Sequence, residues 1–108
     1  MTTALLEGWD IAASAGIPWS PWGEGNLARA KLLASGDGYV LALVEAKAGY
    51  TGTAHEHRHA EMLYVLAGAI RNQGRLMGAG DAYVASAGSQ HTDFCALTDA
   101  TYLSIFKL

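Results

Sequence analysis

The residues of this chain best suited to chemistry are its four histidines, which fall in only two places: His55, His57 and His59 in one segment, and His91 downstream. The spacing of His55 and His57 puts both imidazoles on one face of a β-strand. Neutral imidazole has a free nitrogen lone pair near pH 7 and is the commonest side-chain ligand of transition metals. Glu61 follows soon after His57, so a tight turn over 58–60 would return its carboxylate beside them. This spacing predicts a metal site.

The alternative is that these histidines are structural, because a lone histidine is more often hydrogen-bonded within a protein than bound to a metal. Two histidines at i and i+2, followed by an offset glutamate, are harder to explain in that way. His91 opens a late strand-like segment, from which it could complete a ligand set on the opposite side. We therefore favour metal binding and expect the fold to bring the two places together.

Short strand-like segments, separated by glycine-containing turns, must position these side chains. After the first 28 residues we expect strands over residues 28–34, 39–46, 61–68, 69–71, 75–77, 81–86, 91–97 and 101–108. The turns between them include SGDG, NQG and GAG, and no convincing helical period appears. Regularly spaced short strands are typical of a sandwich or barrel, so we expect a single all-β barrel domain over residues 29–108.

Residues 1–28 are expected to form an irregular N-terminal arm outside this barrel. Pro18 and Pro21, the only prolines of the chain, interrupt any regular element there. The arm also holds all three tryptophans, Trp9, Trp19 and Trp22. We expect them to cover one end of a sheet with apolar surface, and contact with a substrate is the alternative.

Composition and charge exclude several classes of protein. Of the 108 residues, 51% are hydrophobic and only 16% are charged, which a disordered chain would not show. The basic residues are scattered and the net charge is −3, so neither nucleic acid nor an anionic membrane surface is an expected partner. The chain has no apolar run of about 18 residues and no basic N-terminal segment of a secretory signal. The lone Cys95 fits a reducing compartment; we expect a cytoplasmic homodimer that hides part of its apolar surface.

Two gapped motifs resemble those of the cupin superfamily. Residues 49–68 follow G-x5-H-x-H-x3-E-x6-G with every defining position filled, by Gly49, His55, His57, Glu61 and Gly68. Residues 80–95 are similar to G-x5-P-x-G-x2-H-x3-N and keep Gly80, Gly88 and His91. In this second motif Ser86 stands for the proline and Cys95 for the asparagine. Because two independent motifs agree in order, the resemblance is strong.

The resemblance implies a small jelly-roll (cupin) β-barrel with a divalent transition metal inside it. The implied ligands are His55, His57, Glu61 and His91. We expect Fe(II) first and leave Mn, Ni, Cu, Co and Zn open, because three nitrogens and a carboxylate suit all of them. The motif places His59 at a hairpin tip, solvated or beside a ligand. Cys95 is expected to be a small buried hydrophobe rather than a thiolate ligand.

Strand alternation predicts the surroundings of the metal. The residues expected to line the interior beside it are Leu63, Val65 and either Phe94 or Cys95. Arg71 and Arg75 flank the NQG turn and are expected on the surface, where one of them could also reach a substrate carboxylate.

Within the superfamily, the chain looks most like two groups of single cupin domains. One group is the acetylacetone-cleaving dioxygenases, which use Fe(II) and O2; the other is the zinc-binding cupin domain of ChrR-type anti-sigma regulators. Glu61 departs from the three-histidine pattern of the first group. We expect a non-haem dioxygenase acting on a small dicarbonyl, enol or phenolic substrate chelated at the metal, with Glu61 as ligand or as the catalytic base for the enol proton. The alternatives are a metal-dependent isomerase, cyclase or lyase without O2, and a zinc-binding sensor without turnover.

Overall fold

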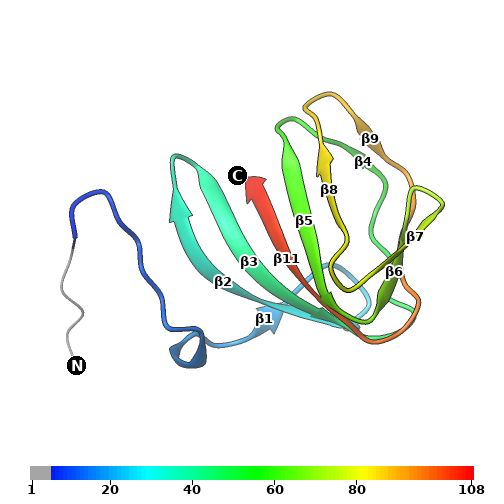
Figure 1. The fold of residues 1–108 in the computed structure, drawn as a ribbon, viewed down its shortest axis with the longest axis horizontal. Coiled ribbons are helices and arrows are strands. Elements are labelled where there is room, and N and C mark those ends of the chain that lie inside the picture. The colour runs from blue at the N-terminus through cyan, green and yellow to red at the C-terminus, as the bar shows by residue number, and fades with distance from the viewer. Residues whose placement is uncertain (1–5) are drawn as a thin grey trace.

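The computed structural model describes residues 6–108, and antiparallel strands dominate it (Figure 1). In chain order the elements are a short 3₁₀ helix η1 (Ser14–Gly16) and the strands β1 (Ser20–Pro21), β2 (Ala28–Gly36), β3 (Tyr39–Ala46), β4 (His55–Glu56), β5 (Glu61–Ala67), β6 (Ala69–Asn72), β7 (Arg75–Gly78), β8 (Ala82–Ala85), β9 (Gln90–His91), β10 (Phe94–Ala96) and β11 (Ala100–Lys107). Within the described part of the chain, no helix is long and apolar enough to cross a membrane. The all-β expectation is confirmed.

The strands form one large sheet and two small ones. The large sheet has the strand order β1-β2-β3-β11-β5-β8, and the small sheets are β10-β6-β7 and β4-β9. All of these pairings are antiparallel. Figure 1 shows the large sheet curving, with the two small sheets lying on the side of β5 and β8. The molecule therefore has two layers with an interior between them.

The core lies between these layers because alternate residues of the large sheet point inward. In β3 every second residue is buried, and the residues between them are only half-buried: the buried set is Val40, Ala42, Val44 and Ala46. A period of two is the pattern of a strand with one face on the core. Ile70 of β6 reaches the same core from the other layer, and together with Val44 and Val65 it is among the largest side chains without exposed surface.

Gly68, the last glycine of the first motif, lets the chain pass from one layer to the other. It lies between β5 of the large sheet and β6 of a small sheet, with φ at +79°. A Cβ at this position would collide with the backbone carbonyl of Asp99 and lie 2.8 Å from the Cα of Ala100. Only glycine meets both requirements, so this motif position is needed by the backbone rather than by the metal.

The N-terminal arm is irregular apart from η1 and β1, and β1 pairs with the edge of the large sheet through Ser20 and Ala30. The expectation for the tryptophans holds in part. Trp22 packs on Phe106, with ring centroids 5.6 Å apart, whereas Trp9 is 70% exposed and covers nothing. The Arg29 guanidinium lies 4.2 Å from the centroid of the Trp19 ring. The boundary between the arm and the barrel at residue 28 stays a prediction. β1 lies before this boundary and nevertheless belongs to the large sheet.

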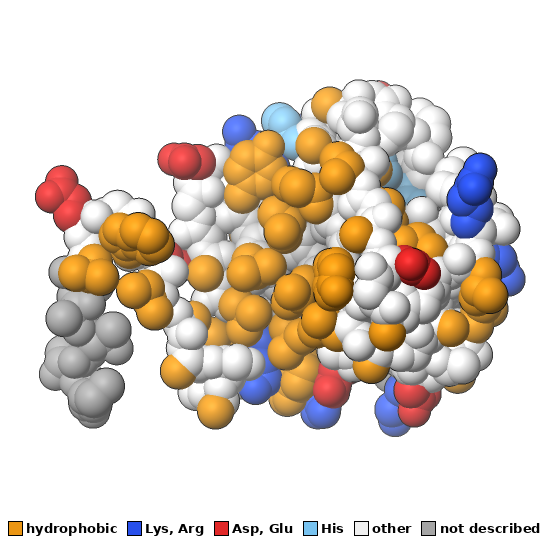
Figure 2. Space-filling view, in the orientation of Figure 1, with side chains coloured by type: hydrophobic (Ala, Val, Ile, Leu, Met, Phe, Trp, Pro, Cys, Tyr) orange, Lys and Arg blue, Asp and Glu red, His pale blue; other side chains and the backbone are white. Residues whose placement is uncertain are grey.

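Hydrophobic side chains also gather on the face of the molecule shown in Figure 2, over β2, β3, β11 and β5. Histidine side chains show at the upper part of this view. The large sheet thus provides apolar surface, and the histidines lie at one end of it.

Candidate metal centre

The two small strands β4 and β9 bring the two histidine segments together. In this antiparallel pair His55 lies directly opposite His91. His57 follows β4, and its backbone N–H donates to the carbonyl oxygen of Ser89 at 2.9 Å, which continues the contact between the segments. The expectation that the fold joins the two places is therefore met through pairing of residues far apart in the chain.

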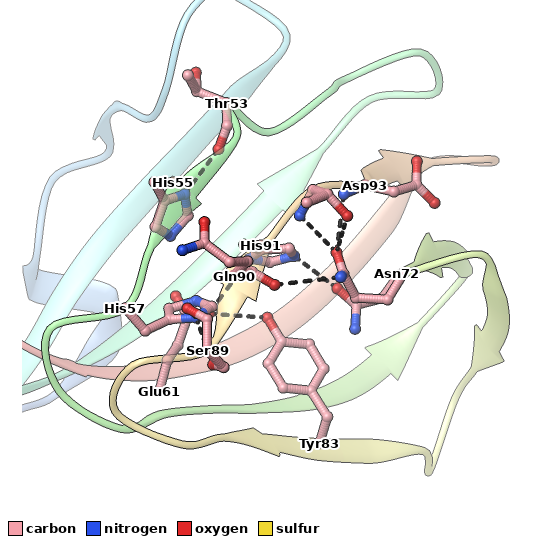
Figure 3. Close-up of polar contacts among 12 residues, drawn as sticks. Thr53, His55, His57, Glu61, Asn72, Tyr83, Ser89, Gln90, His91 and Asp93 are labelled. Atoms are coloured by element: carbon pink, nitrogen blue, oxygen red, sulfur yellow. Dashed lines mark hydrogen bonds and ion pairs between the residues drawn. The ribbon is translucent and has the colours of Figure 1, made fainter.

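The imidazoles of His55, His57 and His91 form a compact cluster, named here the three-histidine group (Figure 3). One ligand atom from each lies within 4.8 Å of the others. The ring centroids are 4.8 to 5.3 Å apart. His57 and His91 are buried, whereas His55 is exposed. The group could hold a metal ion.

His55 and His57 each donate a hydrogen bond to the protein through Nδ1, and Nε2 of His57 lies 3.1 Å from Oε2 of Glu61. The Nδ1–H of His55 donates to the carbonyl oxygen of Thr53 at 2.7 Å. The Nδ1–H of His57 donates to the hydroxyl of Ser89 at 3.0 Å, because that hydroxyl gives its own proton to the carbonyl of Ser86. A hydrogen bond of this kind fixes the tautomer of a ligating histidine. Nε2 of both rings is thus left as an electron-pair donor.

His91 also donates a hydrogen bond through one ring nitrogen, but it uses Nε2 instead of Nδ1. Its Nε2–H donates to Oδ1 of Asn72 at 2.7 Å, while Nδ1 is buried and has no hydrogen-bond partner in the described residues. Burial lowers the pKa of His91, and although the Glu61 charge raises it, the net shift is downward and favours the neutral ring. A buried, unpartnered nitrogen is unfavourable unless something binds it. The His91 lone pair therefore fits a metal ion.

Glu61, the first residue of β5, faces two of these nitrogens. Its Oε2 lies 3.1 Å from Nε2 of His57 and 3.8 Å from Nδ1 of His91. Since His57 already holds a proton on Nδ1, the short contact brings two electron-pair donors together unless a proton or a metal ion lies between them. The Tyr83 hydroxyl donates to the same Oε2 at 3.1 Å; burial, then the Glu61 charge, raises the pKa of Tyr83, which keeps the hydroxyl protonated.

A cavity of about 580 Å³ lies against the histidines and is open to solvent at its mouth. Aromatic side chains form part of its wall, with Trp22, Tyr50, Phe94, Tyr102 and Phe106 among the lining residues, and Glu56, Arg58 and Lys107 add charged groups. Such a volume suits a small organic molecule. Apolar walls exclude water and strengthen the electrostatic interactions inside.

The other predictions about the site have mixed outcomes. Leu63 and Phe94 line the cavity as expected. Val65 does not, because it lies deeper in the core without exposed surface. Cys95 does not line it either, because it alternates with Phe94 on β10, and it is half-buried rather than fully buried. His59 is exposed at the cavity mouth and stands outside the three-histidine group.

Arg71 and Arg75 are exposed, as expected, and neither lines the cavity. Arg71 instead binds the carboxylate of Asp93 at 2.9 Å. Its guanidinium lowers the pKa of Asp93. This pair ties the β6–β7 hairpin to the segment that follows His91.

Sequence reasoning missed the residues that orient the histidines: Asn72, Ser89 and Tyr83. Asn72 is part of the NQG turn in the sequence analysis, yet it is the last residue of β6, and its Oδ1 accepts a hydrogen bond from the Nε2–H of His91. Ser89 lies in a turn before His91, and no local signal marks it as a partner of His57. For Tyr83, strand alternation along β8 would have shown an inward position, but not the contact with Glu61.

Comparison with known proteins identifies the family. A model of the ChrR cupin-like domain matches residues 9–107. The structure of KdgF from a Halomonas species is similar at 23% sequence identity and a TM-score of 0.79, over 92% of this chain and 93% of that one. An acetylacetone dioxygenase from Acinetobacter johnsonii is similar at 15% identity and a TM-score of 0.77, over 99% of this chain and 78% of that one.

A chain in the complex of Rhodobacter sphaeroides SigE with the anti-sigma ChrR is 28% identical, with a TM-score of 0.73 over 85% of this chain. The match covers 50% of that longer chain, so the present chain spans half its length. No protein of curated function matches at a significant level. The structural similarities confirm the jelly-roll cupin fold expected from the two motifs. Because the family model extends over nearly the whole sequence, the chain belongs to the ChrR cupin-like domain family.

Proposed function

We propose that the three-histidine group and Glu61 hold a divalent transition metal, with Fe(II) the first choice, and that the chain is a non-haem dioxygenase of a small dicarbonyl, enol or phenolic compound. One observation carries the metal assignment. Lone pairs of His57 Nε2 and His91 Nδ1 converge on Oε2 of Glu61 at 3.1 and 3.8 Å, and the second of these nitrogens is buried without a partner. A cation at this point would satisfy all three atoms.

The cavity supports a small organic substrate at this centre. A metal there supplies Lewis acidity toward the two oxygens of a chelating substrate and, if it is iron, redox chemistry with O2. The aromatic walls would hold the carbon skeleton and keep water away from the charges. Substrates that lack a second oxygen for chelation are expected to bind much more weakly.

Glu61 is the residue proposed to take the enol proton, at its carboxylate. Tyr83 holds Oε2 at 3.1 Å, which restricts the rotation of the side chain, and the other carboxylate oxygen makes no hydrogen bond to a described residue. A carboxylate within reach of a bound enol is a suitable general base. The same carboxylate could instead serve as the fourth ligand, and substitution separates these roles: Glu61→Gln lowers metal affinity strongly only if the carboxylate is a ligand.

A second candidate, a zinc-binding sensor without turnover, is favoured by the family match and by the similarity to a chain of the SigE–ChrR complex. It would need the same histidines and no oxygen consumption. In a sensor, a small molecule bound in the cavity would change the contacts of the chain with a partner protein, and no product would form.

The deciding experiment is elemental analysis of protein purified under nitrogen without added metal or chelator, followed by oxygen-uptake assays with β-diketones and flavonols. Near-stoichiometric iron together with oxygen uptake supports the dioxygenase; stoichiometric zinc without uptake supports the sensor, and redox-active metal without uptake points to a non-oxidative enzyme. His57→Ala should lose the metal, and His59→Ala, the matched control outside the three-histidine group, should keep it. If His57→Ala retains as much metal as wild type, the ligand assignment is wrong.

A further inference from the structure

Three hydroxyl groups on the cavity wall, each carried by a buried residue, have no role in the metal site just described. They belong to Tyr50, Tyr102 and Ser104, which are only 6%, 3% and 4% exposed and all line the cavity. None of these hydroxyls hydrogen-bonds to another described residue. The Tyr83 hydroxyl, by contrast, donates a hydrogen bond to Oε2 of Glu61. The hydroxyl oxygens themselves stay open to the cavity, because His91 Nδ1 is the one fully buried side-chain atom without a partner among the described residues.

Where the protein offers such a hydroxyl no partner, water or a ligand in the cavity must bind it. An apolar cavity wall would be built more simply with Phe in place of Tyr and Ala in place of Ser. Since these hydroxyls border open cavity volume rather than packed core, a bound molecule can reach them.

Their position places them beyond the metal site along the same wall. On β11, Ser104 lies opposite Leu63 of β5 and Tyr102 lies opposite Val65. Both are therefore on the same face of the sheet as Glu61, with Ser104 nearer to Glu61 and Tyr102 farther along the strands. Residues two apart on a strand are about 7 Å apart. A molecule of a few carbon–carbon bonds could therefore reach from the histidines to these hydroxyls.

One aromatic ring connects the two regions. Phe94 lies 5.7 Å from the ring of His91, 5.6 Å from Tyr102 and 6.3 Å from Tyr50, measured between ring centroids. Both tyrosines thus surround the ring that borders the metal site. Burial raises the pKa of Tyr102 and of Tyr50, so both present O–H groups that can donate a hydrogen bond.

We propose that Tyr50, Tyr102 and Ser104 form a second recognition point, which binds an oxygen-bearing group at the far end of the molecule whose chelating oxygens reach the three-histidine group. This inference rests on the proposed metal site and narrows the substrate class. The natural ligand is an oxygenated small molecule with a hydroxyl or carbonyl several bonds from its chelating end, rather than a simple diketone with a hydrocarbon tail.

Two pyranones that chelate identically but differ in one distal oxygen test this proposal. The probes are 5-hydroxy-2-hydroxymethyl-4-pyranone and its 2-methyl analogue, titrated into Co(II)-loaded protein by calorimetry. Wild type should bind the hydroxymethyl compound about three- to tenfold more tightly, which corresponds to one neutral hydrogen bond. The preference should fall toward one in Tyr102→Phe or Ser104→Ala, and it should persist in Tyr64→Phe, whose tyrosine is 46% exposed on the opposite face. Equal binding of the two pyranones by wild type, or an undiminished preference in Tyr50→Phe, Tyr102→Phe and Ser104→Ala alike, overturns the proposal.

Two further measurements separate this inference from the metal assignment. Co(II) titration without pyranone tests the metal site alone, and the hydroxyl variants should bind Co(II) as wild type does. Thermal unfolding of the metal-free variants tests the hydroxyls alone: Tyr102→Phe and Ser104→Ala should melt close to the wild-type temperature, because each removes a hydroxyl that no other described residue binds. A clear decrease in melting temperature in both variants would mean that the hydroxyls are structural, which refutes the proposal even if the metal binds.

Discussion

Replacing Asn72 by leucine should weaken metal binding although Asn72 is not itself a proposed ligand. Its Oδ1 accepts the Nε2–H of His91 at 2.7 Å, a short hydrogen bond that keeps the proton on Nε2 and the lone pair on Nδ1. Without this acceptor the proton can move to Nδ1, where Oε2 of Glu61 at 3.8 Å is the nearest acceptor. The ring would then present a donor where the metal needs a lone pair. Substitutions of such partners lower metal affinity by about 10- to 100-fold, or about 1.4 to 2.8 kcal/mol.

The assay is a competition titration of Zn²⁺ or Co²⁺ against a chromophoric chelator at pH 7.5. Asn72→Asp is the matched control: it retains an oxygen acceptor of the same size, so its affinity should equal or exceed that of wild type. Circular dichroism of both metal-free variants checks that the strands are intact. If Asn72→Leu is folded and its dissociation constant lies within about twofold of wild type, then Asn72 does not control the His91 tautomer, and the argument from this hydrogen bond fails.

Two other predictions concern the fold and the assembly. Gly68→Ala should lower the free energy of unfolding by more than about 2 kcal/mol, because the new Cβ collides with the backbone of Asp99 while φ stays positive. Denaturant unfolding measures this loss. Gly36→Ala is the control, and it should change the free energy of unfolding far less because nothing lies within 4 Å of the added Cβ. We also expect a homodimer through the outer face of the large sheet, where Tyr64 and Val84 are 46% and 67% exposed. Light scattering at tens of micromolar should give twice the chain mass for wild type and the single chain mass for Val84→Lys. A wild-type monomer would refute this dimer.

The sequence predicted the parts of the site that depend on local spacing. The period of two at His55 and His57, the return of Glu61 after a short turn and the strand pattern around them are short-range features, and each has its counterpart in the structure. The pairing of His55 with His91 is different, because it joins segments more than 30 residues apart. The sequence predicted only that His91 could complete the ligand set, and no local property of the chain selects this register.

What the sequence could not provide is the identity of the groups that orient the ligands. Asn72, Ser89 and Tyr83 come from three different segments, and their contacts depend on how the small sheets lie against the large one. The wrong expectation for Val65 and the choice left open between Phe94 and Cys95 have a similar origin. Val65 was assigned by parity along β5, but parity gives the face of a strand and not the depth at which the cavity ends. Phe94 and Cys95 compete for one inward position on β10, and only the register with β6 decides in favour of Phe94.

The two layers of the fold divide the work of the proposed site between them. The small sheets and their turns carry the histidines and most of the groups that fix their tautomers: His91 is held by Asn72 of β6, and the side-chain oxygen of Gln73 accepts the backbone N–H groups of Thr92 and Asp93 at 2.7 and 2.9 Å. The large sheet carries Glu61 and two of the wall hydroxyls, those of Tyr102 and Ser104. Glu61 meets the histidines at the junction of the layers. Because the hydroxyls of Tyr102 and Ser104 make no hydrogen bond to the histidines, the wall can change to suit another substrate while the metal site keeps its geometry. We therefore expect the wall, rather than the histidines, to determine which small molecule this chain binds.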